Sequence, residues 1–341
     1  ASLDQFFRAA LPVSEPLNAS LPLPEMPPEA TLIAADGSQI NPDRHMGVEY
    51  CLVNVGAIQF RLGETAAPTT TIESRLFYGE QVFSMQEKTV ALIRDMSERE
   101  ILAKLAANAH KPVITLTDGP IELWGREVSL GEAEQAQHDK YHDRYLEALQ
   151  SLYKLDVAHA GYVDKPRSDL LVRLLEIAPK DKVVKDARKN RWLRNLPDIE
   201  VLRSHINPGE RSAIFGLLTK SSQEYEPDFR VHFFYLNVSL DAGKKNLVRV
   251  EIPGWVAAQP LMVDALHAVL VQQCQVVSTK RYPYLLARAD ETAVVSRDEK
   301  RQVDQMIARE LRKQGLDVAE KSQKQQHKEI SRGKPKRKKG F

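Results

Sequence analysis

Two aspartates follow short apolar segments of the chain, and each is followed by a glycine. Asp36 comes after residues 31–35, and Asp118 comes after residues 112–117. Apolar runs of this length are typical of buried strands, and open α/β sheets place their functional sites at the carboxyl ends of strands. Asp-Gly is also a favoured turn dipeptide, so two ordinary turns explain the pair equally well.

A third carboxylate is predicted on a long helix between these aspartates. Over residues 82–108, apolar side chains recur at steps of three and four, which indicates one amphipathic helix. At about 100° per residue, Glu100 falls within the apolar arc, whereas Glu98 lies roughly opposite. Because burying an unpaired carboxylate is costly, we expect Glu100 to contact a cation, a strong donor or a metal ion. The alternatives are a structural pair with an arginine and a position at the rim of the apolar face.

Asp36, Glu100 and Asp118 would together form a cluster of hard oxygen ligands. Such ligands favour Mg²⁺ or Mn²⁺ over zinc. A cluster of this kind suits metal-assisted phosphodiester hydrolysis, in which the ions activate a water and stabilise the leaving oxygen. The sequence therefore favours a metal-dependent hydrolase.

Other polar residues give weaker indications. Lys165 and Arg167 flank a proline beside a predicted turn, where they would hold phosphates or be ordinary surface cations. Arg249 lies on the polar face of a predicted strand, where it would line a groove or pair across the sheet. His138 and His142 have a zinc-compatible spacing, but no third ligand accompanies them, and a solvated helix face is the favoured interpretation.

These residues need a sheet and helices to bring them together. The sequence predicts an extended arm at residues 1–29, because this stretch contains six prolines. A folded domain is predicted at 30–315 and a basic tail at 316–341. Within the domain, strands are predicted at 31–35, 49–61, 69–78, 112–117, 161–163, 231–238 and 247–252. Helices are predicted at 82–108, 132–154, 169–177, 259–273 and 297–314, and Ser168 is the predicted cap of the third. A helical insertion is predicted at 179–225. This order predicts an α/β fold in which helices flank a mixed sheet.

The composition indicates a soluble globular protein. Of 341 residues, 43% are apolar and 28% are charged, and two cysteines without a CxxC motif favour a reducing, cytoplasmic setting. No GxxxxGK[ST], GxGxxG or GxSxG motif is present, which argues against a P-loop NTPase, a Rossmann dinucleotide enzyme and a serine hydrolase. The net charge is +2, yet residues 322–341 hold eight basic residues and one acidic residue. This pattern indicates a polyanion-binding arm or, equally, a solvated tail.

The motifs in their order resemble those of the NurA family of DNA end-processing nucleases. They span almost all of residues 30–315, and comprise residues 35–38 (ADGS), 116–120 (LTDGP), 160–168 (AGYVDKPRS), 233–235 (FFY), 249–253 (RVEIP) and 282–290 (YPYLLARAD). The resemblance implies an RNase H-like core, a homodimer with a central channel, and Mn²⁺-dependent nuclease activity on DNA ends, with Mg²⁺ as an alternative ion. It also implies a hexameric ATPase partner, HerA.

The resemblance also implies roles for individual residues. The metal-binding acids of the family match Asp36 and Asp118, and its helix glutamate matches Glu100 or Glu98, of which the helical-face argument favours Glu100. The late tyrosine of the family matches Tyr282. Its late histidine falls on Asp290, which as an anion could ligate a metal but cannot act as a neutral imidazole donor.

The sequence therefore predicts a divalent-metal nuclease that acts on DNA ends in double-strand break resection with a HerA-type motor. Asp36, Glu100, Asp118 and Asp290 would hold metal, Tyr282 would position water or phosphate, and Lys165, Arg167 and Arg249 would contact DNA. One rival is an inactive RNase H-like adaptor that docks DNA to the ATPase. A metal phosphatase of small substrates is another.

Overall fold

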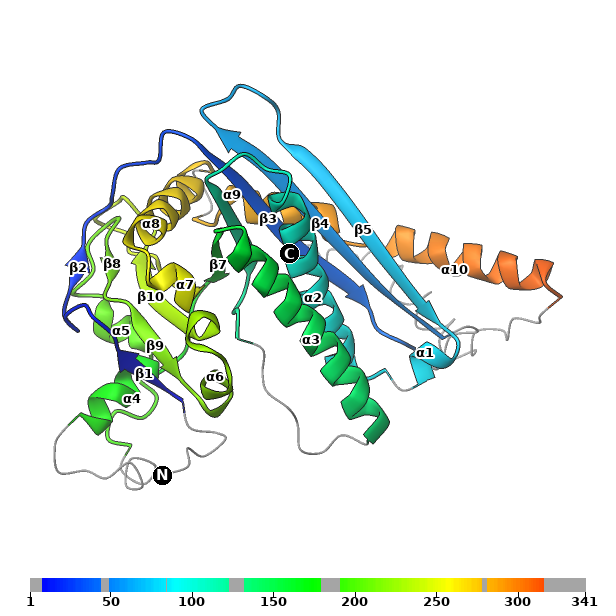
Figure 1. Cartoon of the computed structure of the whole chain (residues 1–341), viewed down its shortest axis with the longest axis horizontal. Coiled ribbons are helices and arrows are strands. Elements are labelled where there is room, and N and C mark those ends of the chain that lie inside the picture. The colour runs from blue at the N-terminus through cyan, green and yellow to red at the C-terminus, as the bar shows by residue number, and fades with distance from the viewer. Residues whose placement is uncertain are drawn as a thin grey trace, which may run out of the picture.

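The computed structural model describes residues 8–43, 49–83, 85–122, 132–178, 191–277 and 281–315. Within these ranges, eleven strands form one mixed sheet, and helices cover both of its faces (Figure 1). No helix in the described part of the chain has the length and apolar character needed to cross a bilayer. The predicted tail at 316–341 and residues 179–190 of the predicted insertion lie outside the described residues.

Five strands form the central half of the sheet. β3 (Ala30–Ile40), β4 (Tyr50–Leu62) and β5 (Thr69–Tyr78) form an antiparallel meander, β6 (Val113–Asp118) pairs in parallel with β3, and β7 (Ala158–Val163) pairs in parallel with β6. One long helix precedes β6 and another precedes β7. The spatial order β5-β4-β3-β6-β7 with these crossovers is that of an RNase H-like core, which confirms the predicted fold class.

Four helices cover the two faces of this half. α2 (Glu87–Ala106) packs on β3 and β4 and is itself packed against α3 (Glu132–Lys154). On the opposite face, α9 (Tyr284–Ala293) packs on β3 and β4, and α8 (Pro260–Gln275) contacts β7 and α9. The central strands are therefore buried on both sides, as parallel strands in α/β sheets are.

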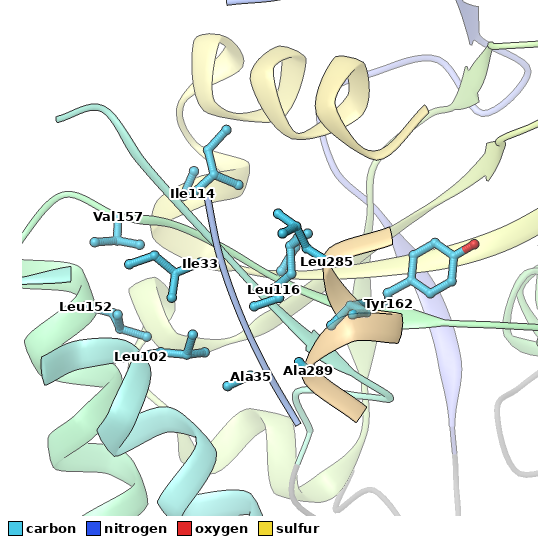
Figure 2. Close-up of a cluster of buried hydrophobic side chains, with 14 of the residues drawn as sticks. Ile33, Ala35, Leu102, Ile114, Leu116, Leu152, Val157, Tyr162, Leu285 and Ala289 are labelled. Atoms are coloured by element: carbon cyan, nitrogen blue, oxygen red, sulfur yellow. The ribbon is translucent and has the colours of Figure 1, made fainter. Parts of the chain in front are cut away.

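The core on either side of β3 and β6 is built from alternating apolar side chains. Figure 2 shows Ile33 of β3 on the side of Leu102 and Leu152, which belong to α2 and α3. Leu116 of β6 lies on the side of Leu285, which belongs to α9. These side chains are all buried, so the strands that carry Asp36 and Asp118 rest on a rigid support.

The other half of the sheet extends from β7. β11 (Leu247–Pro253) pairs antiparallel with β7 and with β10 (Val231–Asn237), so the predicted hairpin of the last two strands is confirmed. β9 (Phe215–Leu218) pairs with β10, and β1 (Ala9–Pro12) closes this edge. The short strands β2 (Ser20–Leu21) and β8 (Arg211–Ser212) pair with each other beside β10.

Two segments of this half were predicted only in outline. The proline-rich arm was predicted to be extended, and its described part contributes the short strands β1 and β2; Pro12 ends an edge strand, a place where a missing amide does no harm. The insertion was predicted to be helical, and it does contain α5 (Asp198–Leu202) and α6 (Lys220–Glu224), but β8 and β9 join the sheet.

The remaining helices agree closely with the sequence pattern. The predicted helix at 82–108 is two helices, since α1 (Glu80–Phe83) ends before Gln86, whose backbone is extended, and α2 follows. The predicted charged helix is α10 (Arg297–Lys313), which starts with a capping box formed by Ser296 and Glu299. The other described helices are α4 (Leu170–Ile177), α7 (Gly254–Ala257) and the 3-10 helix η1 (Pro227–Phe229).

Candidate functional site

Asp36 and Asp118 lie next to each other on neighbouring parallel strands. Ala35 of β3 is in register with Thr117 of β6, so the two aspartates occupy the next position of each strand. Because side chains alternate along a strand, both aspartates point away from the face covered by α2. The two carboxylates therefore meet on one face, Asp118 at the carboxyl end of β6 and Asp36 beside it within β3.

The environment of Asp36 disfavours its charged form. Burial raises the pKa of Asp36 to about 6, and the negative charges of Asp118 and Asp290 add to this shift. The amide of Gly37 donates to Asp36 Oδ1 at 2.8 Å and opposes it. Burial likewise raises the pKa of Asp118, against a hydrogen bond from Tyr282. A carboxylate pair of this kind would be stabilised by a cation between its members.

Gly37 does not form the turn that the Asp-Gly dipeptide predicted. β3 continues through Asp36 and Gly37 to Ile40. A Cβ on Gly37 would lie 2.5 Å from Arg94 Cγ and 3.0 Å from Glu98 Oε1. The glycine is therefore required because side chains of α2 cross the strand directly beside Asp36.

Asp118 does end its strand in the predicted turn. Gly119 has a φ of +84°, a backbone conformation that favours glycine, and its amide donates to Tyr162 O at 2.8 Å. A Cβ on Gly161 of β7 would lie 2.5 Å from Gly119 O. The turn therefore lies flat on β7 because residue 161 has no side chain, and this contact sets the place of Asp118.

Tyr282 and Asp290 reach the same place from the α9 side. Tyr282 bonds the Asp118 carboxylate, and its ring packs edge-on against Tyr162 with centroids 5.4 Å apart. Burial and the negative charge of Asp118 hold the pKa of Tyr282 above its ordinary value, so the hydroxyl stays protonated and donates. The charge of Asp290 acts on Asp36, Asp118 and Tyr282. The structure thus brings together four of the five predicted catalytic residues.

The carboxyl-terminal end of α9 is fixed to the sheet next to these acids. Ser38 Oγ and Asn54 Nδ2 both donate to Ala293 O, at 2.5 and 2.7 Å. A Cβ on Gly56 of β4 would lie 2.8 Å from Ala293 N, so this glycine allows the helix to lie directly on the strand. These contacts place Asp290, one turn earlier on α9, above Asp36.

Glu100 is turned away from the site, which contradicts the helical-face prediction. Its carboxylate pairs with Arg75 and, at 2.6 Å, with Arg144 Nη2, so the alternative of a structural arginine pair is the one observed. Glu98, predicted to face outward, is only 3% exposed and lies between Arg94 and Arg99. The prediction failed because α2 is covered by the sheet and also by α3, so that its buried surface is wider than one apolar arc.

Glu98 is the helix carboxylate that approaches Asp36. Its Oε2 accepts from Arg99 Nη1 at 2.7 Å, and its Oε1 lies 3.7 Å from Arg94 Nε. Burial raises the pKa of Glu98, and the charge of Asp36 acts in the same direction. Of the two glutamates, Glu98 is therefore the one that lies against β3 beside Asp36.

Asp164 is a further acid that the sequence reasoning missed. It directly follows β7, the strand beside β6, and its charge contributes to the raised pKa of Asp118. Its side chain lies 3.7 Å from the Nζ atom of Lys165. A signal was present, because Asp164 directly follows the predicted strand at 161–163, as Asp36 and Asp118 follow theirs, although no glycine comes after it.

Arg249 is not a surface cation, and its burial contradicts a role in contacting DNA. Its Nη2 pairs with Glu251 Oε1 at 2.7 Å and its Nη1 donates to Ser168 Oγ at 2.7 Å. Glu251 Oε2 in turn accepts the amide of Ile121 at 2.9 Å, so the pair supports the segment that follows Asp118. Ser168 was predicted to cap α4; the N-cap is Asp169, and the Ser168 hydroxyl bonds Arg249 instead.

The other predicted cations and histidines are exposed or structural. Lys165 and Arg167 are exposed beside the end of β7, and Lys165 has a φ of +49°. The rings of His138 and His142 stack with centroids 6.2 Å apart, and His142 Nε2 lies 3.1 Å from Tyr225 Oη. Both histidines are half-buried, so the solvated helix face that the sequence favoured is not what the structure shows.

The residues at the strand ends fit a hydrated divalent cation better than a fully protein-bound one. Among the described residues, no three His, Cys, Asp or Glu side chains lie close enough to ligate one ion. Mg²⁺ and related ions are commonly held by one or two carboxylates, with water and substrate phosphate completing the shell. Asp36 and Asp118 supply two hard oxygen ligands whose mutual repulsion such an ion would relieve.

The comparisons with known proteins agree with this geometry. The NurA domain model matches residues 30–295. The structure is similar to the NurA nuclease from Sulfolobus solfataricus, with a TM-score of 0.56, 15% identity, and coverage of 83% of this chain and 85% of that one. It also aligns with a NurA structure with manganese at a TM-score of 0.46 and 11% identity, over 85% and 91% of the two chains. No match is found among curated proteins.

The family match covers most of the chain, including the four acidic positions of β3, α2, β6 and α9 described above. The first structural match shows that the fold is shared as well. The chain therefore belongs to the NurA family.

Proposed function

We propose that this protein is a divalent-metal-dependent DNA nuclease that acts on DNA ends. The observation that carries the proposal is the meeting of Asp36 and Asp118 on adjacent parallel strands, at the point where β6 ends, with Tyr282 and Asp290 facing them. Membership in a family that includes a solved nuclease supports the same conclusion.

Each residue would have a distinct task. Asp36 and Asp118 would hold the ion, which when bound activates a water and offsets phosphate charge. Tyr282 donates to Asp118 and so orients that carboxylate toward the ion. Glu98 approaches from α2, and Asp290 adds negative charge in place of an imidazole.

The ion and the DNA contacts are parts of the proposal. Mn²⁺ is favoured, with Mg²⁺ as an alternative, because the ligands are hard oxygens and a family structure contains manganese. Lys165 and Arg167 are exposed beside Asp164 and would bind the phosphate backbone. Arg249 is left out of this surface because it is buried.

The partners remain those that the family resemblance implies. We propose that the protein forms a homodimer and works with a HerA-type hexameric ATPase in resection of double-strand breaks. This sequence contains no P-loop motif, so these residues supply no motor of that type themselves. Co-purification with such an ATPase, and the mass of the protein in solution, test the two partnerships.

The direct test of the activity uses Asp36→Asn with Glu100→Gln as a matched control. Both changes remove one negative charge, but Glu100 pairs with Arg75 and Arg144 away from the site. With a labelled duplex and Mn²⁺, we expect the first variant to lose nucleotide release by at least about 100-fold and the control to retain most of it. Equal activity of Asp36→Asn and wild type would refute the assignment.

A catalytically inactive adaptor is the second candidate. The observation that favours it is Asp290, which stands where the resemblance places a histidine, in a site where no three described side chains share ligand distance. An adaptor would bind DNA in the same assay but release no nucleotides with either ion.

A further inference from the structure

Arg99 is a buried cation of α2 that contacts both Glu98, its neighbour on that helix, and the segment that follows Asp118. Its side chain is 2% exposed. Its Nη1 donates to Glu98 Oε2 at 2.7 Å and to Asp95 O at 3.3 Å, and its Nη2 donates to Pro120 O at 3.4 Å. A guanidinium presents its donors in a rigid fork, so it fixes two partners relative to each other in a way that a lysine cannot.

Arg99 holds one carboxylate oxygen of Glu98 and leaves the other toward β3. With Oε2 held by Arg99, Oε1 points toward β3, where it lies 3.0 Å from the position that a Cβ of Gly37 would take. That position is adjacent to Asp36, whose charge acts on Glu98. A change at Arg99 would free the Glu98 carboxylate to rotate.

Arg99 also belongs to a set of contacts that hold the segment after Asp118. The hydroxyl of Tyr145 on α3 donates to Ile121 O at 2.7 Å, one residue after the carbonyl that Arg99 binds. The guanidinium carbon of Arg99 lies 5.4 Å from the centre of the Tyr145 ring. Two helices therefore donate to consecutive carbonyls, and each donor packs on the other.

Three buried polar atoms on the residues around this contact have no hydrogen-bond partner among the described residues. They are Arg99 Nε, Thr117 Oγ1 and His159 Nε2. Thr117 precedes Asp118, and His159 lies on β7, where burial mainly lowers the pKa of His159 and the charge of Arg99 adds to this shift. The charge of Arg99 therefore acts on the sheet beside the strand that carries Asp118.

We propose that Arg99 is a positioning residue that couples the orientation of Glu98 to the place of the Asp118 turn. Arg99 contacts neither DNA nor the ion; it sets the acids relative to one another before either binds. The functional consequence rests on the proposed nuclease activity, whereas the coupling itself is a property of the metal-binding acids and can be measured without DNA.

The test compares Arg99→Lys with Arg144→Lys in the full chain. Arg144 is also an arginine that pairs with a glutamate, but its partner is Glu100 on the far side of α2. Mn²⁺ affinity is measured by calorimetry without DNA, and kcat and KM are measured on a labelled duplex. We expect Arg99→Lys to bind Mn²⁺ at least about 10-fold more weakly and to lose kcat with little change in KM, and Arg144→Lys to match wild type.

A second variant covers the case in which Arg99→Lys does not fold. Tyr145→Phe removes a hydroxyl that donates to Ile121 O and also hydrogen-bonds Arg99, and we expect a smaller loss of Mn²⁺ affinity in the same direction. Wild-type Mn²⁺ affinity in folded Arg99→Lys, or in Tyr145→Phe if the first variant is unfolded, would overturn the proposal. Wild-type protein that binds Mn²⁺ and responds to these changes but cleaves no DNA would refute the nuclease and leave the coupling intact.

Discussion

The contact between Gly161 and the Asp118 turn predicts a large effect from adding one methyl group. In Gly161→Ala, the new Cβ would lie 2.5 Å from Gly119 O, whereas ordinary van der Waals contact begins at 3.4 Å. The two atoms must therefore separate by about 0.9 Å. Backbone on both sides is fixed in strand and turn hydrogen bonds, so the turn that carries Asp118 is the part that gives way.

The displacement should affect activity more than stability. Overpacking of this kind costs about 1–3 kcal/mol of folding free energy. A shift of about 1 Å at a reacting group reduces the rate by on the order of 100-fold. We therefore expect Gly161→Ala to remain folded by thermal unfolding and circular dichroism, and to lose about 100-fold in Mn²⁺-dependent release of nucleotides from a labelled duplex.

Gly216→Ala is the matched control. This glycine lies on β9 of the same sheet, and a Cβ there would be 3.5 Å from Leu11 Cβ, which is ordinary contact. We expect wild-type activity from it. If folded Gly161→Ala cleaved DNA as fast as Gly216→Ala, the turn would not set the place of a catalytic Asp118, and the reasoning would be refuted.

Four further substitutions test other residues of the proposed site. The folded pKa of Asp36 is about 6, against an ordinary value of 3.8, so the charged carboxylate destabilises the folded state above pH 6. At pH 7, Asp36→Asn should therefore have a larger free energy of unfolding than wild type, by on the order of 1–3 kcal/mol, and a higher unfolding temperature. Both gains should vanish below about pH 4, where the carboxyl is protonated in either state. Tyr282→Phe should lower kcat by about 10-fold and stability by about 1 kcal/mol, in steady-state assays and urea unfolding, because Asp118 loses one hydrogen bond; an unchanged kcat would exclude Tyr282 from the site. Arg249→Met should lower the free energy of unfolding by about 3–5 kcal/mol, because Glu251 is left buried and unpaired, and should not change the salt dependence of DNA binding. Lys165→Ala should leave stability unchanged and reduce the slope of log affinity against log salt concentration by about 1. The opposite pattern, measured by fluorescence anisotropy, would contradict the assigned places of the two residues.

Local sequence pattern was sufficient to predict most elements of the central sheet. The bounds of β5 and α3 were predicted correctly, because each element has one exposed face. In β5 this produces alternation along the strand, and in α3 it produces a polar face with helical periodicity. The apolar runs before Asp36 and Asp118 predicted their strands, and the parallel pairing follows from the helix between them. These features depend on neighbours that are close in the sequence.

The errors arose where an element distant in the sequence determines the burial or the pairing of a residue. Gly37 was interpreted as a turn residue, but it is a strand residue that accommodates side chains of α2. Glu98 was predicted to face solvent because periodicity along one helix does not reveal that α3 covers its second side. β1 and β9 pair across more than 200 residues of chain, a contact that no local pattern indicates.

The central claim is that Asp36 and Asp118 bind the same divalent cation. Anomalous scattering from a crystal soaked in Mn²⁺ tests it most directly. We predict a manganese peak within about 2.5 Å of oxygens from both carboxylates, with Glu98 on the α2 side and Asp290 on the α9 side. A peak held elsewhere, such as at Glu100, or none between Asp36 and Asp118 at saturating Mn²⁺, would contradict the account.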